Sequence, residues 1–237
     1  MNNYFCFKQF AIAQDNASMK VGTDGVLLGA WCNCTDAQKV LDIGTGTGLL
    51  ALMVAQRSAA QIAAVEIEEL ACLDAVNNIE NSPWANRIEL FNLSVQEFTE
   101  TTTERFDFII SNPPFFSNSL KAPDAARTLA RHNDSLPAAE LFACCAQLLT
   151  NNGIVAIIIP TNLYDEYLAA AHNYNLYVTR RCMVKPTDQL PPHRIMVEFV
   201  FGTQDATNEQ YLTIEQGGRH CYSPEYIELT REFYLKF

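Results

Sequence analysis

Long apolar runs are missing from this 237-residue sequence. No stretch approaches the roughly 20 apolar residues that a membrane-spanning helix needs. The first residues, MNNYFCFKQFAIAQDN, also lack the basic flank and the small-residue cleavage site of a secretory signal peptide. We therefore predict a cytoplasmic protein that does not enter a membrane.

Paired cysteines and clustered histidines are missing too. The eight cysteines form no CxxC pair, and the four histidines are scattered along the chain at His132, His172, His193 and His220. Zinc sites in proteins need closely spaced cysteine and histidine ligands. We expect no metal site, and we interpret the cysteines as small buried side chains in a reducing compartment.

Basic residues are few compared with acidic ones. The chain has 16 lysines and arginines against 27 aspartates and glutamates, which gives a formal net charge of −11. Broad, non-specific binding of nucleic acid requires neutralisation of phosphates, so this balance argues against it. A local basic patch remains possible, because the basic residues gather in two places: Lys121, Arg127 and Arg131, then Arg180, Arg181, Lys185 and Arg194.

Strand-like and helix-like segments alternate from residue 39 onward. The patterns predict strands at 39–44, 61–68, 87–93, 106–111, 153–160, 177–186 and 193–202, and helices at 47–58, 68–81, 135–150 and 162–175. Apolar strands that alternate with helices indicate an α/β fold with a mostly parallel seven-stranded sheet. The last two strands have no helix between them, so we expect the final one to run antiparallel at or beside an edge.

The loop LDIGTGTG (41–48) follows the first of these strands. Its glycines, Gly44, Gly46 and Gly48, allow a sharp turn and a close approach of backbone N–H groups to a ligand. A dinucleotide fingerprint would need G-x-G-x-x-G, but position 49 is Leu. The GxGxG spacing after Asp42 suits S-adenosylmethionine, which has no pyrophosphate.

Glu66 ends the next strand and is the second candidate ligand. A carboxylate at this point of a parallel sheet can accept hydrogen bonds from both hydroxyls of a ribose. Because the carboxyl ends of parallel strands meet at one edge, Asp42, the glycines and Glu66 together predict a nucleoside-cofactor site.

The segment SNPPFFS (111–117) is an unusual way to end an apolar strand. Pro113 and Pro114 bias the residues before them toward extended backbone, which could aim the Asn112 side-chain oxygen and the Pro113 carbonyl at one point. Two acceptors that converge would bind an amino group, and Phe115 offers a ring on which a planar group can stack. A stiffened strand exit with core aromatics is the alternative.

These motifs together resemble those of class I methyltransferases that alkylate amino or amide nitrogens. MKVGTDGVLLGAW (19–31), NSPWANRIEL (81–90), ARH (130–132) and FYLKF (233–237) make the chain similar to one family, the tRNA1(Val) adenine-N6-methyltransferases. The resemblance spans nearly the whole chain. It implies a Rossmann-like class I methyltransferase fold and transfer of a methyl group from S-adenosylmethionine to N6 of the adenosine at tRNA position 37, beside the anticodon.

The resemblance also implies roles for particular residues. The catalytic motif is Asn112, Pro113, Pro114 and Phe115, and the cofactor site comprises Lys20, Thr23, Asp24, Asp42, Gly44, Gly46, Gly48, Glu66, Ser94 and Asn112. Ser94 stands where relatives usually carry an Asp that holds the adenine amino group. The loop residues Lys121, Arg127, Arg131 and His132 are candidates for gripping phosphates of the anticodon loop, or are simply a solvated basic loop.

We expect a single methyltransferase domain over 1–237 that acts as a monomer. Residues 1–38 would be an N-terminal extension that contributes to the cofactor site, and residues 203–237 a C-terminal appendage. Other functions stay open: methylation of release-factor glutamine N5 or of rRNA guanine N2, or a catalytically silent RNA-binding protein on the same fold. A dehydrogenase is the least favoured, because the sequence shows no evident hydride-transfer residues.

Overall fold

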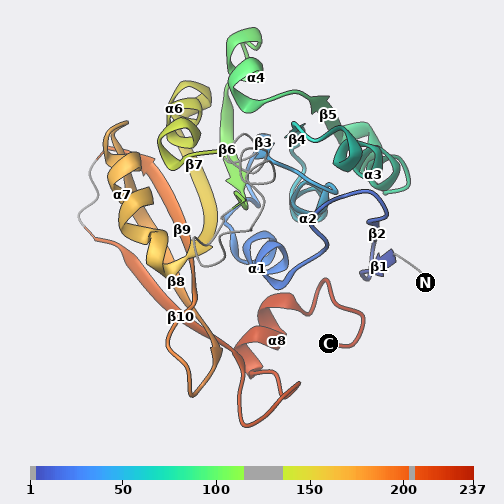
Figure 1. Ribbon diagram of the computed structural model, residues 1–237, viewed down its shortest axis with the longest axis vertical. Helices are drawn as coiled ribbons and strands as arrows, with labels where there is room; N and C mark the ends of the chain where they lie inside the picture. The colour runs from blue at the N-terminus through green and yellow to red at the C-terminus, as the bar shows by residue number, and fades with distance from the viewer. Residues whose placement is uncertain (1–3, 115–135, 203–205) are drawn as a thin grey trace, which may run out of the picture.

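The computed structural model describes residues 4–114, 136–202 and 206–237. Its central feature is an eight-stranded sheet in the order β10-β8-β9-β7-β6-β3-β4-β5 (Figure 1). A separate antiparallel hairpin, β1-β2, lies near the N-terminus. The strands are β1 (Tyr4–Cys6), β2 (Ala11–Ala13), β3 (Lys39–Ile43), β4 (Gln61–Glu66), β5 (Ile88–Asn92), β6 (Phe106–Ser111), β7 (Leu149–Pro160), β8 (Leu176–Thr187), β9 (Arg194–Phe201) and β10 (Asn208–Glu215).

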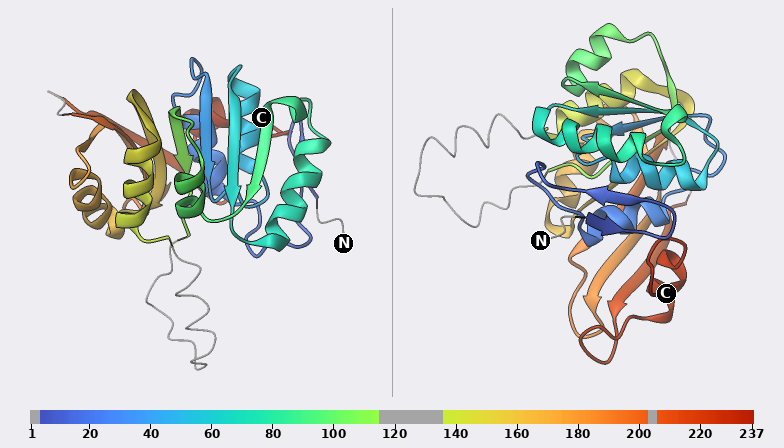
Figure 2. Two further views of the ribbon diagram at one scale, coloured as in Figure 1. Left: turned by 90° about the horizontal axis from the view of Figure 1, so that it is seen from above. Right: turned by 90° about the vertical axis from the view of Figure 1, so that its right-hand side faces the viewer.

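Helices cover both faces of the sheet, as Figure 2 shows. One face packs on α1, α2, α3 and α8, and the other packs on α4, α6 and α7. The α-helices are α1 (Thr23–Trp31), α2 (Leu49–Arg57), α3 (Glu69–Glu80), α4 (Val95–Thr101), α6 (Ala138–Leu148), α7 (Tyr164–His172) and α8 (Pro224–Thr230), and short 3-10 helices are η1 (Ala85–Arg87) and η2 (Thr161–Leu163).

The central strands are apolar because both of their faces are covered. In β3, Val40 packs into the core layer under α1 and α2, whereas its neighbour Leu41 packs into the layer under α4 and α6. Successive side chains of a strand point to opposite faces, so a strand buried on both sides reads as a continuous apolar run. The apolar stretch 154–159 of β7 is the clearest example.

The predicted α/β class and mostly parallel sheet are confirmed. β3, β4, β5, β6 and β7 pair in parallel, and β9 runs antiparallel to both β7 and β8. The sequence did not predict β10, an eighth strand that pairs in parallel with β8 and forms the edge of the sheet. The expected seven strands and the expected place of 193–202 at or beside an edge are therefore wrong, because β8 and β10 both lie outside β9. The sequence also did not predict α1, α4, α8 or the N-terminal hairpin.

The two ends of the described chain pack together. Phe7 forms a β-bridge with Tyr234, and the Lys8 backbone N–H donates to the Phe233 carbonyl at 2.9 Å. The rings of Phe7 and Tyr234 stack with a 6.0 Å separation between centroids, and Tyr226 lies nearby in α8. This aromatic cluster holds the hairpin and the C-terminal segment against the α1–α2 face.

A buried ion pair fixes α1 to the sheet. Arg180 of β8 donates to both carboxylate oxygens of Glu198 in β9, at 2.8 and 2.7 Å, and its guanidinium lies 3.8 Å from the ring centroid of Trp31. The Asn33 backbone N–H donates to the same carboxylate at 2.8 Å. Glu198 is 2% exposed, so its charge depends on these partners.

Substituting Glu198→Gln is expected to lower the free energy of unfolding by about 2 kcal/mol, because the variant leaves the Arg180 charge without its buried counter-ion. Urea denaturation would measure the loss. Glu104→Gln is a matched control, because its ion pair with Lys39 is exposed and should contribute less than ~1 kcal/mol. Equal losses in both variants would contradict the role assigned to Glu198.

In the part of the chain that the structure describes, no helix is both long and apolar enough to cross a membrane.

Candidate active site

The glycine loop and the Asn112 motif meet at the point where the strand order reverses. From β3 the chain continues to β4 and β5 on one side of the sheet, whereas β6 and β7 lie on the other side. The last residues of β3 and β6, Ile43 and Ser111, are direct register partners. In parallel α/β sheets, ligands bind beyond the carboxyl ends of the strands at such a switch point.

Glycine is required in the loop because all of its glycines have positive φ: 69° at Gly44, 57° at Gly46 and 85° at Gly48. A Cβ added to Gly44 or Gly46 would meet nothing within 4 Å, so the loop borders open space. The absence of side chains there allows a ligand to approach the backbone closely.

Asp42 lies beneath this loop and is fully buried. Its Oδ2 accepts hydrogen bonds from the Thr45 hydroxyl at 2.6 Å and the Ala51 backbone N–H at 3.0 Å, but Oδ1 has no hydrogen-bond partner among the described residues. Burial raises the pKa of Asp42 to about 7, and the nearby charge of Glu66 adds to the rise, although the hydrogen bonds from Thr45 and Ala51 oppose it. Asp42 therefore organises the loop through these two hydrogen bonds, and its burial favours the protonated form.

Glu66 reaches the same loop from the end of β4. Its Oε2 accepts from the Gly46 backbone N–H at 2.8 Å, and its Oε1 accepts from the Glu68 backbone N–H at 2.9 Å. The two bonds fix the carboxylate plane. Each oxygen still has a second lone pair, so both can accept from a diol.

Asn112 follows β6 directly and sits across the switch point from the glycine loop. Its Oδ1 is buried and has no hydrogen-bond partner among the described residues. Pro113 is buried and Pro114 is half-buried. Because a buried acceptor without a donor costs about 1–3 kcal/mol, an unpaired Oδ1 points to a donor that arrives with a ligand.

Ser111, to which the sequence analysis assigned no role, holds the start of this motif in place. Its hydroxyl donates to the Ile43 carbonyl at 2.8 Å, and the side chain is 1% exposed. The bond ties the exit of β6 to the exit of β3. A small hydroxyl residue immediately before Asn112 was the available sequence signal.

Two buried polar side chains of α3 hold the residues before α1. Asn78 of α3 accepts from the Ala13 N–H at 2.7 Å and donates to the carbonyls of Ala13 and Thr47, each at 2.9 Å. Asp74 accepts from the backbone N–H groups of Asn16 and Ala17. Sequence reasoning missed both side chains, since polar residues within an amphipathic helix read as solvent-facing.

The three N-terminal cofactor candidates occupy the segment that leads into α1. Lys20 and Thr23 are exposed, and Asp24 is half-buried in the first turn of α1. Asp24 accepts a 2.7 Å hydrogen bond from Arg194, the first residue of β9. This ion pair places the start of α1 at the same end of the sheet as Asn112.

Ser94 begins α4 at the end of β5. Its hydroxyl accepts from the Glu97 backbone N–H at 3.1 Å, and it donates to the Glu97 carboxylate at 2.7 Å. The Ser94 N–H donates to the same carboxylate, which completes a capping box. The structure therefore gives Ser94 a helix-capping role at the carboxyl edge of the sheet.

Several predicted site residues lie outside the described ranges. These are Phe115 and the candidate RNA-binding residues Lys121, Arg127, Arg131 and His132.

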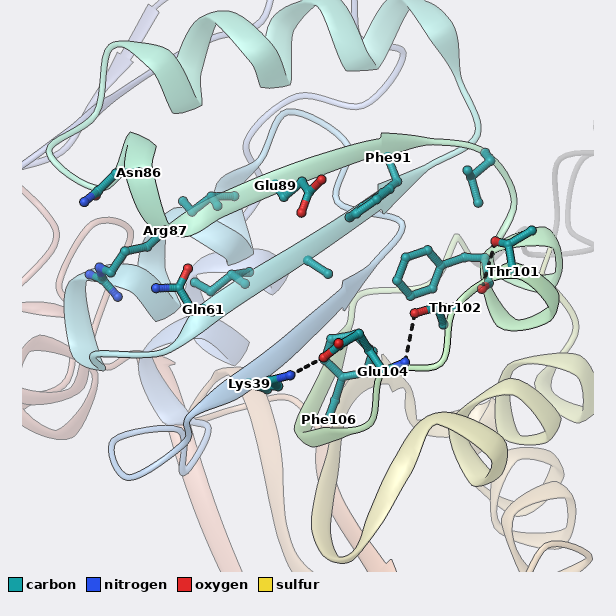
Figure 3. Close-up of a pocket in the computed structure, with 15 residues that line it drawn as sticks. Lys39, Gln61, Asn86, Arg87, Glu89, Phe91, Thr101, Thr102, Glu104 and Phe106 are labelled. Atoms are coloured by element: carbon teal, nitrogen blue, oxygen red, sulfur yellow. Dashed lines mark hydrogen bonds and ion pairs between the residues drawn. The ribbon is translucent and has the colours of Figure 1, made fainter.

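A sizeable cavity lies at a different place. It has a volume of about 560 Å³ and is lined mainly by residues of β4, β5 and the segment after α4 (Figure 3). Lys39 and Gln61, which begin β3 and β4, mark its position near the amino ends of these strands. None of the predicted site residues that the structure describes lines this cavity. The cavity is therefore separate from the candidate active site.

Relatives with assigned names identify the family. The sequence is 47% identical to a tRNA1(Val) (adenine(37)-N6)-methyltransferase of Bacteroides thetaiotaomicron over 237 residues, which cover 99% of this chain and 98% of the relative. A protein with the same name from Bacteroides fragilis is 45% identical over 234 residues, with 98% of each chain covered. The chain belongs to the tRNA1(Val) (adenine(37)-N6)-methyltransferase family.

Two further comparisons concern the domain and the fold. Residues 22–175 match the family described as "Methyltransferase small domain". The fold is similar to that of an Agrobacterium tumefaciens protein described as a predicted O-methyltransferase, with a TM-score of 0.67, 17% identity, and coverage of 89% of this chain and 96% of the other. This similarity concerns the fold alone.

Among the described residues, no group of three or more histidine, cysteine, aspartate or glutamate side chains could hold a metal ion. The cysteines are free, and all but Cys6 and Cys221 are buried.

Proposed function

We propose that the protein transfers the methyl group of S-adenosylmethionine to N6 of the adenosine at position 37 of a valine tRNA. The observation that carries the chemistry is the unpaired, buried Oδ1 of Asn112, which lies across the switch point from an open glycine loop. The target is supported by the names of relatives with 47% and 45% identity over nearly the whole chain.

The residues present fit S-adenosylmethionine. Glu66 would accept the ribose hydroxyls, and the open side of Gly44 and Gly46 would lie against the rest of the molecule. Asp42 would hold negative charge beneath the loop once ionised. When bound, S-adenosylmethionine supplies an electrophilic methyl group on a positively charged sulfur.

Asn112 would prepare the nucleophile. The lone pair of an adenine amino group is delocalised into the ring, which makes N6 a poor nucleophile. If Asn112 Oδ1 and the Pro113 carbonyl accept its two hydrogens, they favour a pyramidal nitrogen with a localised lone pair. Positioning of this kind can supply much of the acceleration. After attack, the nitrogen is cationic and loses a proton readily, so no strong base is needed.

We further propose that residues 1–38 form one wall of the cofactor site. The hydrogen bonds of Ala13 to Asn78 and of Asn16 and Ala17 to Asp74 support this arrangement, because they hold the N-terminal segment beside the glycine loop. In this proposal residues 1–237 act as one methyltransferase domain, with residues 203–237 as an appendage. The enzyme would act as a cytoplasmic monomer on the anticodon loop.

The decisive experiment uses labelled S-adenosylmethionine and total tRNA from a strain that lacks the gene. We expect N6-methyladenosine at position 37 of one valine tRNA, mapped by nuclease digestion and mass spectrometry. Label in a release factor or in rRNA guanine would instead support one of the alternative amino methyltransferases. Cofactor binding without transfer to any RNA or protein would support a silent scaffold.

Substituting Glu66→Gln is expected to weaken the binding of S-adenosylmethionine about 30-fold, which corresponds to ~2 kcal/mol. Gln keeps the size of the side chain, but its amide nitrogen cannot accept from a hydroxyl or from the Gly46 N–H. Calorimetric titration with S-adenosylmethionine measures the change. The control Glu69→Gln alters an exposed carboxylate in the first turn of α3 and should bind as the unchanged protein does. An unaltered Kd in Glu66→Gln would refute the ribose assignment.

A further inference from the structure

The adjacent arginines of the second basic cluster face opposite sides of the sheet. Arg180 is held by Glu198 on the α1 side. Arg181 points to the other side, where it contacts Tyr164 of α7 and Glu209 of β10. The sequence groups the two residues together, yet their surroundings differ, and Arg181 borders a cavity.

This cavity has a volume of about 190 Å³. It is lined by Thr161, Tyr164, Arg181, Met183, Ile195, Glu209 and Tyr211. Pockets for whole cofactors or drug-sized ligands usually measure about 300–1,000 Å³. A cavity of this size suits one planar ring rather than a complete cofactor.

The polar groups of the cavity are fixed in advance. Arg181 Nε donates to Glu209 at 2.7 Å, and another guanidinium nitrogen donates to the Tyr164 hydroxyl at 3.2 Å. The Tyr211 hydroxyl donates to Glu209 at 2.5 Å. Glu209 therefore orients both the guanidinium plane and the Tyr211 ring, and less ordering remains to be done when a ligand binds.

Tyr211 nevertheless exposes much of its ring to solvent. Its exposed fraction is 64%, although the hydroxyl is anchored. The Arg181 guanidinium lies 5.7 Å from the centroid of the Tyr164 ring. Aromatic and guanidinium planes of this kind are the surfaces on which unpaired nucleobases stack.

The cavity lies at the same end of the sheet as Asn112. Thr161 and Tyr164 follow the carboxyl end of β7, and Ile195 lies next to Arg194, which pairs with Pro160. In the sheet order, β8 is three strands and β10 four strands away from β6. With strands roughly 4.8 Å apart, Arg181 and Tyr211 are on the order of 15–20 Å from Asn112 across the sheet, a span that a few nucleotides of one RNA strand can cover.

We propose that Tyr164, Arg181 and Tyr211 form a subsite that stacks an unpaired nucleobase a few nucleotides away from the target adenine. This inference rests on the proposed function, because it assigns part of the same RNA substrate. Lys185 follows Arg181 and Met183 on the same face of β8, since alternate residues of a strand share a face, and it would approach the adjoining phosphate. Because the Arg181 charge is paired with Glu209, Lys185 would supply the positive charge for this contact in a chain of net charge −11.

The test measures binding of a fluorescent anticodon stem-loop RNA by anisotropy, together with kcat and KM for the full tRNA. Tyr211→Ala is expected to weaken RNA binding roughly 10-fold and to raise KM, with kcat at saturating tRNA unchanged. Tyr211→Phe keeps the ring and should stay within about 2-fold of the unchanged protein. Tyr174→Ala is the matched control, because this half-exposed tyrosine follows α7 at its far end.

An unchanged Kd for the stem-loop RNA in Tyr211→Ala would overturn the subsite. An equal loss of RNA affinity in Tyr211→Phe and Tyr211→Ala would also overturn it, because the Phe variant keeps the ring and the loss could not come from stacking. The proposed function can fail separately. If the unchanged protein methylates tRNA but Tyr211→Ala binds RNA normally, only the subsite is wrong. If the unchanged protein methylates no tRNA but Tyr211→Ala still binds the stem-loop about 10-fold more weakly than Tyr174→Ala, the base-stacking site stands and the proposed reaction falls.

Discussion

Replacing Asn112 by alanine is expected to lower kcat for methyl transfer about 1,000-fold, or ~4 kcal/mol of transition-state stabilisation. The variant loses the acceptor that would hold one hydrogen of the target amine. The affinity for S-adenosylmethionine should fall far less than kcat, because Asn112 is only one of the predicted cofactor contacts, and Glu66 and the glycine loop remain. Single-turnover methylation of valine tRNA measures the rate of methyl transfer, and calorimetric titration measures the affinity for S-adenosylmethionine.

The free energy of unfolding of Asn112→Ala gives a second, independent test of its role. Because Asn112 Oδ1 is buried without a partner among the described residues, removing it should not lower the free energy of unfolding. Asn152→Ala, an exposed change in β7, is the matched control and should retain normal kcat. An Asn112→Ala protein with normal kcat would contradict the proposal that Asn112 holds the target amino group. A variant that loses activity only because it unfolds would show that Asn112 is structural.

The stability of the ligand-free protein is expected to fall between about pH 4 and pH 7 because of Asp42. Its pKa is 3.8 when unperturbed but about 7 in the fold, where burial is the main cause. In this window the unfolded chain has released a proton that the folded protein still holds, so rising pH favours unfolding. Because the free energy of unfolding falls by ~1.4 kcal/mol for each pH unit in the window, the loss reaches about 4 kcal/mol and is complete above pH 7.

Urea denaturation across this range would measure the effect. Asp42→Asn cannot ionise, so its free energy of unfolding should lack the part of the decline that the unchanged protein shows from pH 4 to pH 7. The exposed Asp36→Asn is a control that should keep the full decline. Parallel curves for Asp42→Asn and the unchanged protein would show that Asp42 is ionised throughout, and thus better solvated than its burial implies.

Segments with a strong periodic pattern were predictable to within a few residues. The expected strand at 106–111 matches β6, and the expected helix at 47–58 contains α2. Both are central elements whose burial determines their composition. By contrast, β10 has the sequence NEQYLTIE, in which polar residues dominate because this edge strand is only partly buried. The strand forms through pairing with β8, which its own residues do not reveal.

The candidate site shows the same division. DIGTGTG, Glu66 and Asn112-Pro113-Pro114 could be recognised because each motif is continuous and follows a strand. Asp74 and Asn78 could not, because their partners lie in the backbone of residues 13–17, far away in the sequence. For Ser111 the only signal was a small hydroxyl residue before Asn112, and its partner, the Ile43 carbonyl, is 68 residues away. Arg180 and Arg181 cannot be told apart in the sequence. In the fold, Arg180 contacts Glu198 and Arg181 contacts Glu209, because adjacent residues of a strand face opposite sides of the sheet.

The sequence by itself determined most of the strands and helices between residues 39 and 202 and the motifs at the strand ends, because apolar periodicity and glycine or proline content act locally. Only the tertiary structure decided which of these ends become neighbours. The pairing of β3 with β6 brings Ile43 beside Ser111, and Asn112 thereby faces the glycine loop from more than 60 residues away. That proximity depends on burial and strand pairing across the whole sheet, which no single segment encodes.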